Sequence, residues 1–83
     1  MLVIGRKNRE RILIDGIWVA IDCITDNQLR AVIGDRAYIL ELGRTLVYGC
    51  ILIKYRRLQQ TTAHIGISAP KDVTIIREEL LNY

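Results

Sequence analysis

Arginine and lysine are the residues in this sequence whose types and positions best suit the binding of a ligand. Arg6 and Lys7 stand together near the N-terminus, and Arg77 stands near the C-terminus. A guanidinium group offers a planar fork of donors that fits a phosphate or the edge of a guanine. With 12 Lys and Arg against nine Asp and Glu, the net charge is +3. These residues favour binding of an anionic partner.

Each of these cations also has a plainer interpretation. Arg6 and Lys7 end a short apolar stretch, where positive charge discourages edge-to-edge aggregation of a strand. Arg77 has two acidic candidates for an ion pair, Glu78 beside it and Glu41. Residue type by itself leaves both interpretations open.

Patterns typical of catalysis and metal binding are missing. No pair of carboxylates flanks a motif, no nucleophile has a base in sequence reach, and there is no glycine-rich phosphate loop. Cys23, Cys50 and the single His64 have no metal-ligand spacing. We expect two free thiols, although a disulfide between them is not excluded. The sequence therefore predicts no enzyme, no cofactor and no metal.

Length and composition predict one small, mostly β domain. A chain of 83 residues fits a single domain. Ile, Val and Thr supply 24 residues, and their β-branched side chains favour strands over helices. No apolar run reaches the ~18 residues of a membrane span. The apolar start turns basic at Arg6, the reverse of a signal peptide, so we expect a cytoplasmic protein.

Alternation of apolar and polar residues predicts nine short strands and a C-terminal helix. Asp15-Gly16 is a strong signal for a hairpin turn between the second and third strands. Glu78 and Glu79 stand in the first turn of the predicted helix, where the helix dipole favours anions. The expected strands cover residues 1–7, 11–15, 17–23, 29–33, 37–42, 45–48, 51–56, 63–67 and 73–76, and the helix covers 77–83.

An offset of 34 residues lays the first half of the chain over the second without gaps. Ile12 falls on Leu46, Ile17 falls on Ile51, and the hairpin turns coincide. Identities are few, and a simple β meander shows similar agreement. Periodicity alone therefore leaves an internal repeat and a plain meander equally open.

The C-terminal stretch carries a more specific signal. Residues 65–80 read Ile-Gly-Ile-Ser-Ala-Pro-Lys-Asp-Val-Thr-Ile-Ile-Arg-Glu-Glu-Leu. This run closely resembles the fourth strand, loop, fifth strand and helix start of the carbon storage regulator family, CsrA/RsmA. Residues 1–7, with Glu10 and Ile14 after them, resemble the first two strands of that family. Residues 27–30, Asn-Gln-Leu-Arg, resemble its Asn-Gln-Val-Arg turn.

The resemblance implies interleaved antiparallel sheets, with strand one of one protomer beside strand five of its partner. It also implies binding to GGA motifs, usually in hairpin loops of mRNA leaders, which modulates translation. The partners would be RNA and a second protomer, with no DNA and no membrane. Carried onto this sequence, the implied RNA site comprises Ile4, Arg6, Lys7, Ala69, Pro70, Lys71, Val73, Ile75 and Arg77.

The chain is longer in the middle than the family pattern. Residues 1–34 look like a first copy that lacks strand five and the helix, and residues 35–83 look like a second copy with an altered first strand. We therefore expect a single CsrA-like domain, a pseudo-dimer in one chain with one RNA site. The alternative is a homodimer with a β insertion and two sites. A degenerate member that pairs with, or titrates, a full-length paralogue is the alternative function.

A second basic cluster, Lys54, Arg56 and Arg57, has no counterpart in the family pattern. A solvated strand face is the favoured interpretation. The alternatives are an extension of the RNA path or a contact with a partner protein.

Overall fold

Nine strands and one short helical turn form the part of the chain that the computed structural model describes, residues 1–81. The mostly β prediction is confirmed, and each expected strand occurs with ends shifted by a few residues. Where the sequence predicts a helix over residues 77–83, the structure has a single 3-10 turn, η1. Residues 82–83 of that predicted helix lie outside the described residues. No helix in residues 1–81 has the length and apolar character needed to cross a membrane. The strands are β1 (Leu2–Arg6), β2 (Glu10–Ile14), β3 (Ile17–Asp22), β4 (Gln28–Ile33), β5 (Arg36–Glu41), β6 (Thr45–Tyr48), β7 (Ile51–Gln59), β8 (Thr62–Ser68) and β9 (Ile75–Arg77), followed by η1 (Glu78–Leu81).

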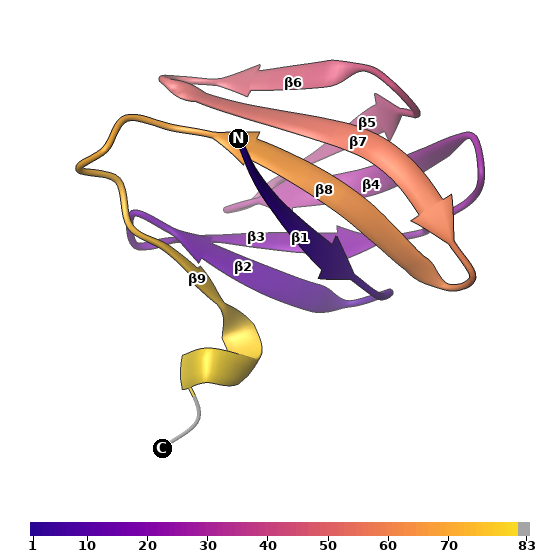
Figure 1. The fold of residues 1–83 in the computed structure, drawn as a ribbon, viewed down its shortest axis with the longest axis horizontal. Helices are drawn as coiled ribbons and strands as arrows, with labels where there is room; N and C mark the ends of the chain where they lie inside the picture. The colour runs from indigo at the N-terminus through magenta and orange to yellow at the C-terminus, as the bar shows by residue number, and fades with distance from the viewer. Residues whose placement is uncertain (82–83) are drawn as a thin grey trace.

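The strands form two antiparallel sheets that pack face to face (Figure 1). Sheet A has the order β1-β8-β7-β6, and sheet B has the order β5-β4-β3-β2-β9. Strand β1 therefore joins three strands from the second half of the chain. Strands β5 and β9 in turn flank three strands from the first half. Neither sheet is complete without strands from both halves.

The pairing registers repeat at the offset of 34 residues that the sequence showed. In sheet A, Leu2 of β1 pairs with Ile67 of β8, and in sheet B the positions 34 residues away, Arg36 and Ile33, also pair. The pairs of β2 with β3 and of β6 with β7 match in the same way. Strand β9 pairs with β2, and no described strand takes the equivalent place beside β6. The two sheets thus have the same strand pairing, except that sheet A has no described strand in the place that β9 takes in sheet B.

Alternating isoleucines fill the space between the sheets. Ile12 and Ile14 of β2 point inward, as do Ile53 of β7 and Ile65 of β8, and all four are buried. Tyr55 is also buried, and its hydroxyl donates a 2.6 Å hydrogen bond to the carbonyl oxygen of Thr25 in the other sheet's β3–β4 turn. Apolar burial of this kind is the main stabilising contribution to a small β domain.

Local turn chemistry directs the chain between strands. Asp15 and Gly16 both have positive φ, 50° and 80°, as a type I′ hairpin turn requires. Gly49, at the corresponding turn between β6 and β7, has a φ of 60°. The hairpin predicted from Asp15-Gly16 is therefore confirmed.

Truncation of a core isoleucine should destabilise the domain strongly. Ile21 has no exposed surface in β3, so Ile21→Ala should lower the free energy of unfolding by roughly 2–5 kcal/mol, because it removes buried methylenes and leaves a cavity. Ile39→Ala is the matched control, since Ile39 is 61% exposed and its truncation should change stability by less than about 0.5 kcal/mol. Urea denaturation measures both values. Equal losses in the two variants would contradict this packing.

Candidate nucleic-acid interface

The candidate site lies where an edge strand of one sheet meets an edge strand of the other. Strand β1 is the edge of sheet A, and β9 is the edge of sheet B. Figure 1 shows β1 on the same side of the molecule as β9 and η1. An ion pair between Arg6, at the end of β1, and Glu79 in η1 joins the two edges. The N- and C-terminal segments are thereby brought into one surface.

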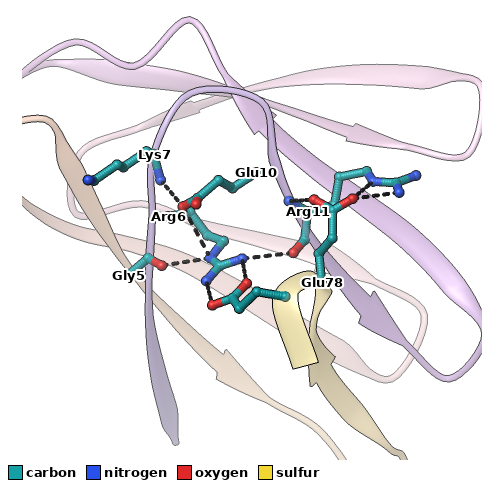
Figure 2. A network of polar contacts seen from close by, with 7 residues as sticks. Gly5, Arg6, Lys7, Glu10, Arg11 and Glu78 are labelled. Carbon is teal, nitrogen blue, oxygen red and sulfur yellow. Dashed lines mark hydrogen bonds and ion pairs between the residues drawn. The ribbon is translucent and has the colours of Figure 1, made fainter. Parts of the chain in front are cut away.

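Arg6 is buried at this junction, and polar groups occupy all three nitrogens of its guanidinium (Figure 2). Its two terminal nitrogens donate to the carboxylate of Glu79 at 2.9 and 2.7 Å. Nε donates to the carbonyl oxygen of Gly5, and one terminal nitrogen also donates to that of Arg11. Only 3% of Arg6 is exposed. The side chain therefore has little capacity left for a phosphate, and its position makes it a structural anchor of the site.

Glu79 is the partner that makes the burial of this cation tolerable. A buried charge without a hydrogen-bonded counter-ion is strongly destabilising. The hydrogen bonds from Arg6 lower the pKa of Glu79 to about 2, from an ordinary value of 4.5. The carboxylate thus stays charged at neutral pH and holds η1 against β1.

A second ion pair fixes the start of η1 to β2. The guanidinium of Arg11 contacts the carboxylate of Glu78 at 2.6 and 2.7 Å, and the backbone N–H of Arg11 also donates to that carboxylate. These hydrogen bonds lower the pKa of Glu78. The guanidinium of Arg11 also lies 4.0 Å from the ring centre of Trp18, within cation–π range. Trp18 alternates with the inward-facing Val19 in β3 and therefore covers the outer face of sheet B.

Backbone hydrogen bonds hold the Ala-Pro loop that precedes β9, one inside the loop and one at its C-terminal end. The backbone N–H of Val73 donates to the carbonyl oxygen of Pro70 at 3.0 Å, and the carbonyl oxygen of Thr74 accepts from Asp15 N–H at 2.8 Å. Ala69, Val73 and Ile75 are partly buried and pack against the hydrophobic core. A loop fixed in this way presents its remaining backbone groups in a constant arrangement, which lowers the entropy lost on binding.

The predicted site residues divide into anchors and exposed groups. Ile4 is buried in the core, and Arg6 is the anchor described above. Lys7, Pro70, Lys71 and Arg77 are exposed, and Ala69, Val73 and Ile75 are half-buried beneath them. Within residues 1–81, Arg77 has no ion pair, because Glu78 and Glu79 are engaged by Arg11 and Arg6. The plainer interpretation of Arg77, a pair with Glu78 or Glu41, does not occur in the described part of the chain.

Sequence reasoning missed the positioning role of Glu78 and Glu79. It assigned both carboxylates to the dipole of a helix, whereas the helix is one 3-10 turn and the carboxylates bind Arg11 and Arg6. The available signal was the pair of Glu residues directly after Arg77. Without the fold, nothing in the sequence relates Glu79 to a cation 73 residues away.

The corresponding position in the other half of the chain lacks this chemistry. Adding 34 to Arg6 and Lys7 gives Leu40 and Glu41 at the end of β5. Leu40 is buried to the same extent as Arg6, at 3% exposed. Within residues 1–81 no strand equivalent to β9 and no turn equivalent to η1 lies there, and an apolar residue takes the buried place. The junction formed by Arg6 and Glu79 therefore occurs once within residues 1–81.

Within residues 1–81, the cysteines and the other possible metal ligands form neither a disulfide nor a metal cluster. Cys23 and Cys50 are both exposed and free, so they do not pair with each other. No cluster of three or more His, Cys, Asp or Glu side chains suited to a metal forms within the described part of the chain.

One comparison with known proteins matched this chain. Residues 45–83 match the model of the CsrA family, described as a global regulator protein family. The matched segment contains β6 to β9, the Ala-Pro loop and Arg77. Neither the curated proteins nor the solved structures returned a match.

The Arg6–Glu79 pair should make stability depend on pH in the acid range. Because folding depresses the pKa of Glu79 from 4.5 to about 2, the pair stabilises the fold fully above pH 4.5 and loses this contribution as the pH falls toward 2. The variant Glu79→Gln should therefore lose less stability than the wild type over that range. Urea midpoints at pH 7, 4.5, 3 and 2 measure the difference, with Glu41→Gln as the control. Parallel curves for wild type and Glu79→Gln would refute the role of this pair.

Proposed function

From the match of residues 45–83 to the CsrA global regulator family, we propose that the chain is an RNA-binding post-transcriptional regulator that recognises GGA motifs in hairpin loops of mRNA leaders or small RNAs. Binding there would modulate translation in the cytoplasm, without catalysis and without a cofactor. The observation that carries the proposal is Arg77, which lies at the end of β9 within the matched residues, is exposed, and has no ion pair within residues 1–81.

Arg77 has the chemistry and the support that base recognition needs. Its guanidinium can bind the acceptor edge of a guanine or a phosphate through two donors at once. The residues after it are tied to β1 and β2 by the two ion pairs of η1. Its backbone pairs with Ile12 in sheet B. The side chain thus projects from a fixed backbone, which favours selective over general binding.

The surrounding residues supply the rest of the proposed contact. Lys7 and Lys71 are exposed and would bind phosphates, which fix the register of the RNA and make affinity depend on salt. Ala69, Pro70 and Val73 would act through backbone groups that read unpaired bases in the loop. In this scheme Arg6 and Ile4 hold the strand and do not contact RNA themselves.

We further propose that the chain is a single-chain pseudo-dimer with one RNA site. The repeated registers support an internal duplication, with residues 1–34 as the first copy and 35–83 as the second. The absence of a described strand beside β6 and the exchange of Arg6 for Leu40 both remove the second site. One chain would then bind one hairpin and could not bridge two.

Substitution of Arg77 should abolish GGA selectivity and leave the fold intact. We expect Arg77→Gln to weaken binding of a GGA-loop hairpin roughly 10- to 100-fold, and Arg77→Lys to restore it only in part, because Lys lacks the planar fork. A GCA-loop hairpin is the control RNA, and unchanged urea midpoints show that the variants fold. Titration with light scattering should give one hairpin per chain. Equal affinity of the wild type for both RNAs would refute the proposal, and two hairpins per chain would refute the single site.

A second candidate function rests on the free edge of β6. This strand, Thr45–Tyr48, carries no charged residue and no proline, and Val47 on it is 65% exposed. Natural edge strands usually carry such features to block pairing with other chains. An unprotected edge at the place where β9 lies in the other sheet would accept a fifth strand from a full-length family member. The chain would then act by pairing with a paralogue.

A charge on β6 separates the two functions. Val47→Lys should prevent edge pairing, because a charged residue on an edge strand opposes it, and it should leave hairpin affinity unchanged, since β6 lies at the opposite edge of sheet A from β1. The measurement is co-elution of the chain with a full-length CsrA-family protein. Co-elution with the wild type that Val47→Lys removes would support the second function. Absence of co-elution in both would eliminate it.

A further inference from the structure

Charge is distributed unequally between the two sheets. The four strands of sheet A contain no Asp or Glu, whereas strands of sheet B contain Glu10, Asp22 and Glu41. The other six acidic residues lie in turns, in loops and in η1. The cations Lys54, Arg56 and Arg57 all belong to β7 of sheet A. Sheet A therefore presents positive charge without acidic neighbours in its own strands.

These three cations share the outer surface of sheet A. Ile53 and Tyr55 point inward and are buried, so Lys54 between them points outward. Tyr55 of β7 pairs with Ile65 of β8 and Arg57 pairs with the next residue, His64, so Arg56 is the extra residue of a bulge. A bulge of this kind redirects a side chain that regular alternation would turn to the other face. We call Lys54, Arg56, Arg57 and His64 the basic face.

Glycine lets one of these arginines lie across the sheet. Gly66 of β8 pairs with Lys54 on one side and with Val3 of β1 on the other. Any side chain at Gly66 would collide with Met1, and its Cβ would come within 3.1 Å of the Arg56 side chain. Arg56 also contacts the sulfur of Met1. The basic face thus reaches from β7 over β8 to the start of β1.

No ion pair within residues 1–81 neutralises these cations. The ion pairs of the described chain involve Arg6, Arg11 and Arg30. Arg56 and Arg57 are exposed, and Lys54 is half-buried. Unpaired cations on a face without acidic neighbours attract a polyanion.

We propose that the basic face binds the phosphate backbone of the RNA segment that flanks the recognised hairpin loop. This inference rests on the proposed function and extends it along the RNA. Lys7, which directly follows β1, belongs to the proposed site, and β7 lies two strands from β1, about 10 Å at the usual spacing between strands. An RNA held at β1 and β9 can therefore continue over sheet A. Contacts to phosphates carry no sequence information, so the basic face adds affinity and leaves GGA selectivity unchanged.

The test measures the affinity of the wild type, a basic-face variant and a matched control variant for an RNA with and without a single-stranded extension. One RNA is a minimal GGA-loop hairpin, and the other carries a ten-nucleotide single-stranded extension at one end, tested in turn at the 5′ and the 3′ end. Arg56→Gln with Arg57→Gln removes two charges from the basic face. Arg36→Gln with Arg44→Gln removes two exposed charges elsewhere and is the control. Urea midpoints establish that both variants fold.

The extension should strengthen binding to the wild type at low salt, and the basic-face variant should lose roughly five- to tenfold of this gain. For the basic-face variant on the extended RNA, the slope of log affinity against log salt concentration should also fall in magnitude by about 1.4, or roughly 0.7 for each of two lost phosphate contacts. The control variant should keep both. Equal gains in all three proteins would overturn the inference, and so would an equal loss in the control. Failure of the proposed function has another signature: the wild type would then bind GGA and GCA hairpins equally, whether or not the extension adds affinity.

Discussion

Each sheet of this protein is completed by strands from the opposite half of the chain, and this exchange constrains the rest of the structure. Strand β1 pairs with β8, and β9 pairs with β2, so the longest-range contacts of the chain close both sheets. Half of the chain would leave an open sheet with its isoleucine face in water. Such distant pairings must form before the core is buried, which is typical of slowly folding β proteins. The exchange also brings the two terminal segments into one surface.

The Arg6–Glu79 ion pair shows what that surface requires. A guanidinium is buried at the end of β1, and it is tolerated because η1 supplies a carboxylate in bidentate contact. At the equivalent place in β5 no such turn is described, and Leu40 is buried instead. The exchange of a paired charge for an apolar side chain follows from the cost of burying an unpaired charge. The two halves thus share a backbone layout but differ in chemistry at one edge.

The acidic and basic residues of this protein are distributed unequally between the two sheets. Acidic groups serve the structure, since Glu78, Glu79 and Asp22 hold Arg11, Arg6 and Arg30 in place. Among the cations without an ion pair within residues 1–81, Lys7, Lys71 and Arg77 belong to the segments around β1 and β9, and Lys54, Arg56 and Arg57 lie on the outer face of sheet A. A chain with a net charge of only +3 can therefore present a strongly positive side to an RNA. The placement of the cations on the surface, more than the net charge of the chain, decides where positive charge is presented.

Local patterns in the sequence determined the elements. Alternating β-branched residues specified the strands, and Asp15-Gly16 specified its hairpin, because strand formation and turn geometry depend on neighbouring residues. The sequence also placed Arg77 and the Ala-Pro loop among the candidate binding residues. Only the tertiary structure decided that Arg6 is a buried anchor, that Glu79 is its partner and that the β7 bulge aligns Arg56 with Arg57. Each of these depends on pairing between distant strands, whose register is set by the packing of a shared core and not by any stretch of sequence alone.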